Sequence, residues 1–474
     1  MKVKIVIKYG GTSLSTAKQI KDIAGFVSDN SKKNDLVVVC SAIKGTTDRL
    51  IEISAQVNRG NRACAKQTVT QLIRTHRRLA RQTITDLQNR NSLLDSLKDD
   101  FVELTELVDG IVLLGEITPR SKDYLLSFGE RLSIKIVAHA IADRGTRSQS
   151  ITGSDAGIVT DSNFGESKPL MDTTTLRVSK TIGKILAGGM IPVIGGFAGA
   201  DQHGHITTFG RGGSDYTATI IGVCMQADEI WLMTDVDGLM TADPSIVKDA
   251  ILLREVSYVE ATEMALFGAK QIHPRTFEPL LTKKILMRVR STSNTSNPGT
   301  LITPSPSTWE EKTIKCVSVR RHNGLVDIRS GNMVGARGTA AKIFSTLAKA
   351  GVNITMISQS PSESSISVVV NSTDLDGAIN ALETELLGGI IKRLEVTVDV
   401  AVVALIGSGM RGTVGIAAKV FGAVARHNIN VAMIAQGSSE LDLAFVVKDE
   451  DAESAVMALH EECELSSINQ RFGV

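Results

Sequence analysis

The chain has 474 residues, which is more than one hydrophobic core accommodates, so its length favours two to four domains. Apolar residues make up 42% and charged residues 22%, as in a soluble globular protein, and the formal net charge of +1 excludes a global field that steers the chain to nucleic acid or membrane. Five scattered cysteines without a CxxC pair argue against a disulfide framework and a zinc site.

The first part of the chain alternates short apolar strands with helices. Residues 3–7 (VKIVI) predict a strand, and Ile20, Ile23, Ala24 and Val27 recur after it at helical spacing. This alternation predicts a parallel, helix-covered sheet whose ligands lie beyond the carboxyl ends of its strands. Further strands are expected at 35–40, 191–197, 205–209, 229–238 and 285–290, the last of them closing this part of the fold.

Two other stretches have a distinct character. Residues 62–112 are polar with helical apolar spacing, which predicts a helical subdomain that covers part of the site. Residues 291–312 are rich in proline, serine and asparagine, which predicts a linker or domain boundary.

The sequence after this boundary contains a repeat. Residues 336–360 match residues 410–438, and Asn353 and Asn430 lie 77 positions apart, as do Gln359 and Gln436. This period is too long for a solenoid and predicts two copies of a small domain. The first copy ends in a strand at 394–398, whereas the second lacks a clear last strand. The unassigned strand at 314–320 suggests that the first copy is inserted into the second.

A lysine and two glycines follow the first strand. In Lys8-Tyr9-Gly10-Gly11, glycines allow backbone amides to approach a phosphate, and the lysine supplies a mobile charge. The order differs from both GxxxxGK[ST] and GxGxxG, so neither a P-loop nor a dinucleotide fingerprint is present. By itself the segment fits a structural turn equally well.

A second glycine-rich loop, Gly210–Asp215, opens a helix. Arg211 can pair with a carboxylate or a phosphate in bidentate fashion. Asp215 can instead be a simple helix cap, although three glycines around an arginine exceed what a cap requires.

Two later loops complete the set. Thr234–Gly238 carries carboxylates that could orient a ribose or Mg²⁺, and it is equally a common Asp-Gly turn. Lys270 follows a small-residue turn and is either a phosphate ligand or a solvated side chain. Together, Lys8, Arg211 and Lys270 on glycine loops favour phosphoryl transfer, which depends on positive groups and in-line positioning.

The motifs resemble those of the aspartate kinase family, and the repeat resembles paired ACT domains. The resemblance covers nearly the whole chain. It rests, in chain order, on KYGGTSL (8–14), SAIKGTTD (41–48), FGERLS (128–133), GGF (195–197), GRGGSDYTA (210–218), TDVDGLMTADP (234–244) and GAKQIHP (268–274).

The resemblance implies an α/β fold, with a three-layer amino-acid-kinase domain at 1–303 followed by ferredoxin-like ACT domains at 314–398 and 399–474. It implies transfer of phosphate from ATP to the side chain of L-aspartate, the first step of lysine, threonine and methionine biosynthesis. A carboxylate acceptor is ionised at pH 7, so no general base is required. Mg²⁺ is expected to arrive with ATP.

Roles for individual residues follow from the same resemblance. The catalytic residues would be Lys8 and Asp215. The nucleotide would contact Lys8, Gly10, Gly11, Thr234, Asp235, Met240 and Lys270. The aspartate would contact Ser41, Thr47, Glu130 (through its ammonium group), Phe197 (as a wall), Arg211 (through its α-carboxylate) and Ser214. The family usually has tyrosine at Met240 and arginine at Ser245, so altered nucleotide contacts are expected.

The ACT resemblance implies an effector site at Met333, Gly338, Thr339, Ile354, Thr355, Gln359 and Gln436. The sequence around the two glutamines resembles that of threonine-sensitive aspartate kinases more than that of lysine-sensitive ones, which favours threonine as the effector. Core packing for Ile354 and a helix cap for Thr339 remain alternatives. ACT domains generally pair edge to edge, which implies a homodimer or larger homo-oligomer.

Three alternatives stay open. The chain could be another amino acid kinase, but acetylglutamate, glutamate and uridylate kinases lack an ACT pair. It could be a non-catalytic amino-acid sensor, which would show no turnover. A nucleic-acid-binding module is disfavoured by the near-neutral net charge and by an aromatic content of only 4%. No apolar window suits a membrane span or signal peptide, so we expect a cytoplasmic location. Because the sequence ends after the second copy, we expect no fused homoserine dehydrogenase.

Overall fold

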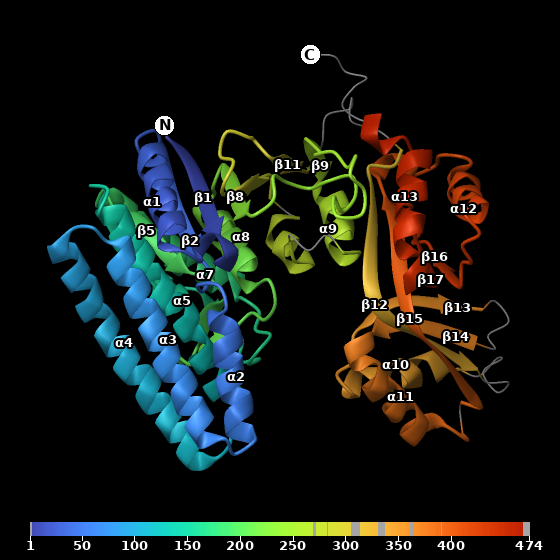
Figure 1. The fold of residues 1–474 in the computed structure, drawn as a ribbon, viewed down its shortest axis with the longest axis horizontal. Helices are drawn as coiled ribbons and strands as arrows, with labels where there is room; N and C mark the ends of the chain where they lie inside the picture. Colours follow the sequence, from blue (N-terminus) through green and yellow to red (C-terminus); the bar gives the residue numbers. More distant parts are fainter. Residues whose placement is uncertain are drawn as a thin grey trace. The chain divides into compact units, whose positions relative to one another are not determined.

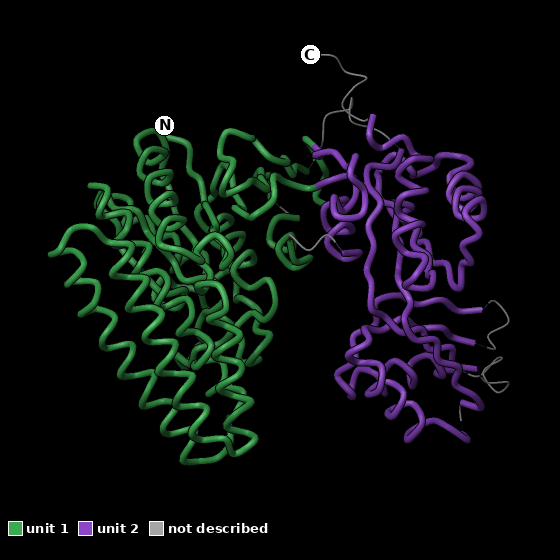
Figure 2. Tube along the Cα trace, in the orientation of Figure 1, with its two compact units in different colours: residues 1–239, 254–258, 271–306 green, residues 240–253, 259–270, 307–474 purple. Residues whose placement is uncertain are grey.

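A computed structural model describes residues 2–268, 272–281, 283–304, 313–329, 337–360, 365–389 and 391–467. The chain divides into two compact units (Figure 2). Unit 1 comprises residues 1–239, 254–258 and 271–306, and unit 2 comprises residues 240–253, 259–270 and 307–474. Two short segments of the region expected to be catalytic, 240–253 and 259–270, therefore belong to unit 2.

The described residues of unit 1 form an eight-stranded sheet that is parallel except for one antiparallel pair, β10 with β11. Runs of β-branched residues such as VVVC in β2 explain why these segments form buried strands. In sheet order the strands are β3 (Ser148–Ile151), β5 (Ile191–Gly195), β2 (Asn34–Cys40), β1 (Val3–Tyr9), β8 (Glu229–Thr234), β10 (Leu286–Ser291), β11 (Thr300–Thr303) and β9 (Glu255–Ser257).

Helices cover both faces of this sheet (Figure 1). Ile5, Ile7 and Tyr9 face a core shared with the first five helices, whereas α7 and α8 pack on the opposite face. The helices are α1 (Ala17–Ser31), α2 (Thr46–Asn58), α3 (Arg62–Thr83), α4 (Leu87–Leu114), α5 (Pro119–Ala142), α6 (Gly153–Ala156), α7 (Met171–Ala187) and α8 (Gly213–Met225). This is the expected three-layer α/β architecture, and α3 and α4 confirm the helical subdomain predicted for 62–112.

Two predictions for unit 1 were wrong. The strand expected at 205–209 is present as β7 (Ile206–Thr208), but it does not join the parallel sheet: it lies in a separate small sheet with β4 (Val159–Thr160) and β6 (Ala198–Asp201), antiparallel to β6. The strand at 286–291 does not close the sheet, because Thr300–Thr303 forms β11 between β10 and β9. The stretch 291–312 is therefore not a linker throughout.

Unit 2 contains two αβ repeats built on one sheet, which the described residues show with six strands. Their order is β13 (Ile354–Gln359), β14 (Ser365–Asn371), β12 (Cys316–Arg329), β15 (Arg393–Ile406), β17 (Asp442–Lys448) and β16 (Met433–Ala435). The associated helices are α9 (Tyr258–Leu266, in this unit from residue 259), α10 (Thr339–Lys349), α11 (Ser372–Leu386), α12 (Ile416–Arg426) and α13 (Ala452–Glu462).

The two long strands β12 and β15 connect the repeats. Residues 316–320 of β12 lie beside 402–406 of β15, in the second repeat, whereas residues 325–329 pair with 393–397 of β15 and with β14. The first half of β12 is thus a strand of the second repeat. Alternate residues of β15 face two cores: Val403 packs with α12 and α13, and Val402 faces the core shared by both repeats.

None of the helices in the described part of the chain has the length and apolar content that a membrane span requires.

Candidate active site

Four central strands of unit 1 end in the same row of the sheet. Tyr9 of β1 lies opposite Cys40 of β2 and Met233 of β8, and Cys40 lies opposite Gly195 of β5. The chain leaves β1, β2 and β5 directly after this row and β8 one residue later, at Thr234, so the loops that carry KYGG, SAIKGTT, GGF and TDVDG start at one edge. This is the edge where α/β sheets bind their ligands.

Lys8 and Asp215 form an ion pair at this edge. The Lys8 Nζ atom lies 2.5 Å from Asp215 Oδ1, and each side chain is only 12% exposed. Lys8 is the penultimate residue of β1 and Asp215 lies in the first turn of α8, whose 13 residues start after Gly212 without a side-chain cap. The partial positive charge of the helix N-terminus and the lysine therefore lie together, which suits an anionic ligand.

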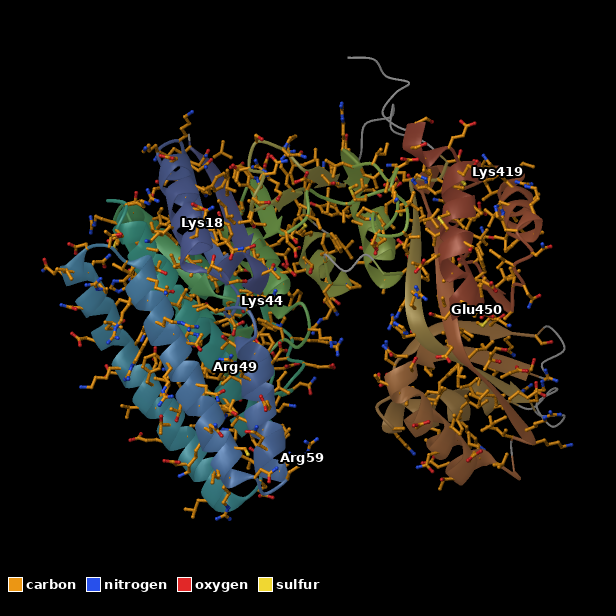
Figure 3. The ribbon with its side chains drawn as sticks, viewed as in Figure 1. Lys18, Lys44, Arg49, Arg59, Lys419 and Glu450 are labelled. Carbon is orange, nitrogen blue, oxygen red and sulfur yellow. The ribbon has the colours of Figure 1, made fainter. Side chains whose placement is uncertain are left out.

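The loop after β1 lies directly on the loop after β2. A Cβ atom at Gly11 would stand 2.8 Å from the Ala42 carbonyl oxygen, so a side chain has no room there. A Cβ atom at Gly10 would stand 3.5 Å from Lys8 Nζ, which places this glycine beside the lysine head group. Lys44 is exposed on the second loop, just before α2 (Figure 3). A ligand at Lys8 can thus reach the backbone of both loops.

Hydrogen bonds to β1 and α5 hold the start of the loop that follows β2. Ser41 donates its amide to the Tyr9 carbonyl oxygen at 3.0 Å, and the Ser133 hydroxyl donates to the Ser41 carbonyl oxygen at 2.8 Å. Thr47 is half-buried in the first turn of α2. Both residues expected to contact the substrate therefore lie on a rigid segment at the strand edge.

Glu130 is a buried carboxyl group on α5 that is only partly satisfied. Its Oε1 atom accepts a hydrogen bond from the Ala42 amide at 3.0 Å, whereas Oε2 has no partner among the described residues. Burial raises the pKa of Glu130 to about 8. The side chain is 5% exposed and borders a cavity of about 610 Å³. A buried carboxyl group with a free oxygen is suited to receive a cationic group of a ligand.

The Gly196-Phe197 turn packs against the start of α8. A Cβ atom at Gly196 would stand 2.9 Å from Ser214 Cα, and one at Gly213 would stand 3.1 Å from Phe197 Cα. Phe197 has a φ of +68°, a left-handed conformation that is rare for a bulky residue. The structure therefore brings Phe197, Ser214 and Asp215 together.

Other candidate residues are less constrained. Arg211 is exposed on the loop before α8, and the half-buried Thr234 donates its hydroxyl to the exposed Asp235 at 3.1 Å. Met240 belongs to unit 2, where it forms a bridge with Leu252, and Lys270 lies outside the described residues. The GAKQIHP motif nevertheless reaches the helix start, because a Cβ atom at Gly212 would stand 2.2 Å from His273 Cβ.

Sequence reasoning missed two contacts at this site. The Ala42 amide binds Glu130, and the Thr217 hydroxyl accepts a hydrogen bond from the Phe197 amide at 3.0 Å. No residue type marks a backbone amide as a partner. Thr217 belongs to the GRGGSDYTA motif and lies four positions after Gly213. On a helix this spacing places the two residues one turn apart, and it was the available signal that Thr217 lies near the start of the helix.

The expected effector residues lie in unit 2. Gly338 and Thr339 start α10, Ile354 and Thr355 start β13, and Gln359 is the exposed last residue of that strand. The Thr355 hydroxyl is buried without a partner among the described residues. Gln436 is exposed directly after β16, and Met333 falls outside the described part of the chain.

Family models match most of the chain. Residues 3–291 match the amino acid kinase family, and residues 326–386 and 403–463 match the ACT domain. The chain is 31% identical over 463 residues to the bifunctional aspartokinase/homoserine dehydrogenase of Haemophilus influenzae, covering 96% of this chain and 56% of that protein. It is 30% identical to aspartokinase 2, chloroplastic, of Arabidopsis thaliana, covering 96% and 83%. The chain spans about half the length of the bifunctional relatives that it matches.

Solved structures agree with these matches. The structure of E. coli aspartokinase III in complex with aspartate and ADP (R-state) superposes with a TM-score of 0.80 at 27% identity, covering 97% of this chain and 99% of that chain. The same enzyme in complex with lysine and aspartate (T-state) gives 0.79 at 28% identity with the same coverage.

Proposed function

The chain belongs to the aspartokinases of the amino acid kinase family, and on this premise we propose that it phosphorylates the side-chain carboxylate of L-aspartate with ATP. The products are 4-phospho-L-aspartate and ADP. The proposal places the protein at the first step of lysine, threonine and methionine biosynthesis.

The observation that carries the proposal is the Lys8–Asp215 ion pair at the uncapped start of α8. Phosphoryl transfer requires positive charge around the transferred group and in-line positioning of the acceptor. Lys8 supplies a full charge and the helix N-terminus a partial one, and both lie where the central strands end. Asp215 holds the lysine head group in place and orients it toward the phosphates.

The nucleotide phosphates are held mainly by backbone in this proposal. Gly10 and Gly11 donate amides to the phosphates, and Gly10 lies beside the Lys8 head group. Thr234 ends β8 and Asp235 follows it at the same strand edge, and both contact the remainder of the nucleotide. The proposed nucleotide contacts of Met240 and Lys270 rest only on the TDVDGLMTADP and GAKQIHP motifs.

The aspartate is held by groups of opposite charge. Glu130 receives the α-ammonium group through the Oε2 atom, which has no partner in the described part of the chain, and the exposed Arg211 pairs with the α-carboxylate. Ser41, Thr47 and Ser214 supply polar contacts, and Phe197 forms a wall. An ammonium group beside Glu130 stabilises its ionised form, which burial otherwise disfavours.

Mg²⁺ is proposed to enter bound to ATP. The described residues hold no cluster of three or more His, Cys, Asp or Glu side chains that could bind a metal ion by themselves. Carboxylates at the site fit a supporting role, because Mg²⁺ at nucleotide sites usually keeps several waters and binds phosphates plus one or two carboxylates. Asp235 is the exposed carboxylate at the strand edge that fits this role.

Feedback by an amino acid is proposed for the ACT repeats, with threonine as the effector. The effector would lie at the start of α10 and β13, where the buried Thr355 hydroxyl group has no partner among the described residues, and would contact Gln359 or Gln436. The T-state structure of E. coli aspartokinase III contains lysine, so lysine is the alternative. We further propose a homodimer or larger homo-oligomer assembled through the ACT repeats.

The test is acceptor-dependent ADP release by the purified chain with MgATP. We expect release with L-aspartate and only background release with L-glutamate or without an acceptor. Equal release under all three conditions would refute the proposed substrate. A protein that binds an amino acid but never releases ADP would instead be a sensor.

A further inference from the structure

We propose that Thr217 is a positioning residue for aspartate, because its hydroxyl group holds the turn that carries Phe197 against the first turn of α8. This inference rests on the proposed function and goes beyond it. No contact between Thr217 and the substrate is required.

The turn is held in a conformation that its own sequence does not favour. β5 ends at Gly195 and β6 begins at Ala198, so Gly196 and Phe197 form the short connection between these two strands. Phe197 has a φ of +68°. A phenylalanine persists in this region only where the surrounding structure imposes it. The contacts that impose it therefore determine where the ring lies.

Hydrogen bonds fix both backbone groups of Phe197. Its amide donates to Thr217 Oγ1 at 3.0 Å, and its carbonyl oxygen accepts from the Phe209 amide at 2.9 Å. The Thr217 hydroxyl also donates to the Gly213 carbonyl oxygen at 2.7 Å, and the residue is fully buried. One hydroxyl group thus links the turn to the backbone of the helix start, and its orientation is set from both sides.

Close packing transmits this link to the site. The backbones of the turn and the helix approach each other closely, since a Cβ atom at Gly213 would stand 3.1 Å from Phe197 Cα. The same turn of α8 carries Ser214 and Asp215. A turn released from Thr217 would move the Phe197 wall relative to these groups, and the geometry of the aspartate pocket would change.

The hydroxyl group is the part of Thr217 that the inference requires. Valine has nearly the same shape and preserves the packing of α8, but it leaves the part-buried Phe197 amide without the Thr217 hydroxyl as its acceptor. Phe197 can then relax toward the extended conformation that its side chain prefers. Serine retains the hydroxyl group and should retain the turn.

Thr219 provides a matched control on the same helix. It is also fully buried, and its hydroxyl group donates to the Tyr216 carbonyl oxygen at 2.8 Å, inside the helix. Thr219→Val therefore removes an equivalent hydroxyl group without touching the turn. A general effect of removing a buried hydroxyl group from α8 would appear in both variants.

The experiment compares steady-state kinetics of the full chain and its Thr217→Val, Thr217→Ser and Thr219→Val variants. For Thr217→Val we expect the KM for aspartate to rise about tenfold, while the KM for ATP changes less than about twofold. Thr217→Ser should stay near wild type, and so should Thr219→Val. An equal KM for aspartate in the two valine variants would overturn the inference.

A double-mutant cycle checks that Thr217 acts through Phe197. Glycine adopts positive φ without penalty, so Thr217→Val should cost less in a Phe197→Gly background than in wild type. Additive effects would overturn the inference. If wild type shows no aspartate-dependent turnover, the proposed function fails and the inference fails with it. If wild type turns over but the two valine variants do not differ, only the inference fails.

Discussion

The carboxyl group of Glu130 binds the Ala42 amide with one oxygen at 3.0 Å and leaves its other oxygen unpaired among the described residues. This relationship joins α5 to the loop that follows β2. It leaves a carboxyl group inside the protein with a free acceptor atom, and burial raises its pKa to about 8. Several predictions rest on this state.

Aspartate binding should depend on pH through Glu130. Below pH 8 the free protein holds Glu130 protonated, and the ammonium group of the substrate requires the carboxylate, so binding releases a proton. The KM for aspartate should fall as the pH rises toward 8, by up to about tenfold per pH unit, and then level off. A pH series of kcat and KM measures this, and the KM for ATP serves as the internal control.

The Glu130→Gln variant should raise the KM for aspartate and abolish its pH dependence. Glutamine keeps the hydrogen bond from Ala42 but carries no charge for the ammonium group. A variant with the same pH profile as wild type would show that another group titrates.

Glu130 should also affect stability, with a defined sign. Its pKa in the folded protein, about 8, exceeds the ordinary value of 4.5, so its contribution is fully present below about pH 4.5 and is lost as the pH rises through 8. The Tm of Glu130→Gln relative to wild type should therefore increase between about pH 5 and about pH 9. A Tm difference that is independent of pH would contradict the raised pKa.

Lys8→Ala should lower kcat by about 10²–10³-fold, because the charge that stabilises the transferred phosphoryl group is lost. Asp215→Ala should lower kcat as well, since Lys8 loses the carboxylate that lies 2.5 Å from its Nζ atom. Urea unfolding of both variants separates this effect from stability. Turnover at the wild-type level in either variant would show that the substituted residue has no catalytic role.

Gln359→Ala should weaken feedback inhibition without changing uninhibited turnover, because this exposed side chain lies in unit 2 at the end of β13. The measurement is an inhibition curve with threonine, lysine and methionine in turn. Gln436→Ala tests the equivalent position in the second repeat. Unchanged curves for both variants would exclude the two glutamines from effector binding.

Lys315→Met should destabilise unit 2 by about 3–5 kcal/mol, because it removes one charge of a buried ion pair with Glu260. The two side chains are 5% and 0% exposed and lie 3.0 Å apart, and Glu260 also binds Ser408. Lys448→Met breaks the exposed pair with Glu450 and should cost less than about 1 kcal/mol. Equal costs in urea unfolding would contradict the role of burial.

The sequence predicted the fold where local signals are strong. Apolar runs such as VKIVI predicted the central strands, and the repeat predicted two copies of a small domain. Short elements were not predicted: β9 has three residues and β11 has four, and neither carries a periodic pattern. The separate sheet that contains β7 was not predicted, because the sequence of a short strand does not indicate which strand it pairs with.

The candidate site was predicted in part. The motifs singled out Lys8, Asp215 and Glu130, but their contacts join residues far apart in the chain, and spacing carries no information on such distances. The left-handed conformation of Phe197 depends on packing against α8 and not on its neighbours in sequence. The roles assigned to all the site residues, and the domain boundaries, stay predictions.

The most direct test of the central claim is to trap the product. An acyl phosphate reacts with hydroxylamine, so a reaction with MgATP, L-aspartate and hydroxylamine should yield a side-chain aspartyl hydroxamate in a 1:1 ratio to ADP. Lys8→Ala should lower both products together. Release of ADP by wild type without hydroxamate, or hydroxamate formation that is insensitive to Lys8→Ala, would contradict the proposal that Lys8 and the α8 N-terminus direct phosphate to the aspartate side chain.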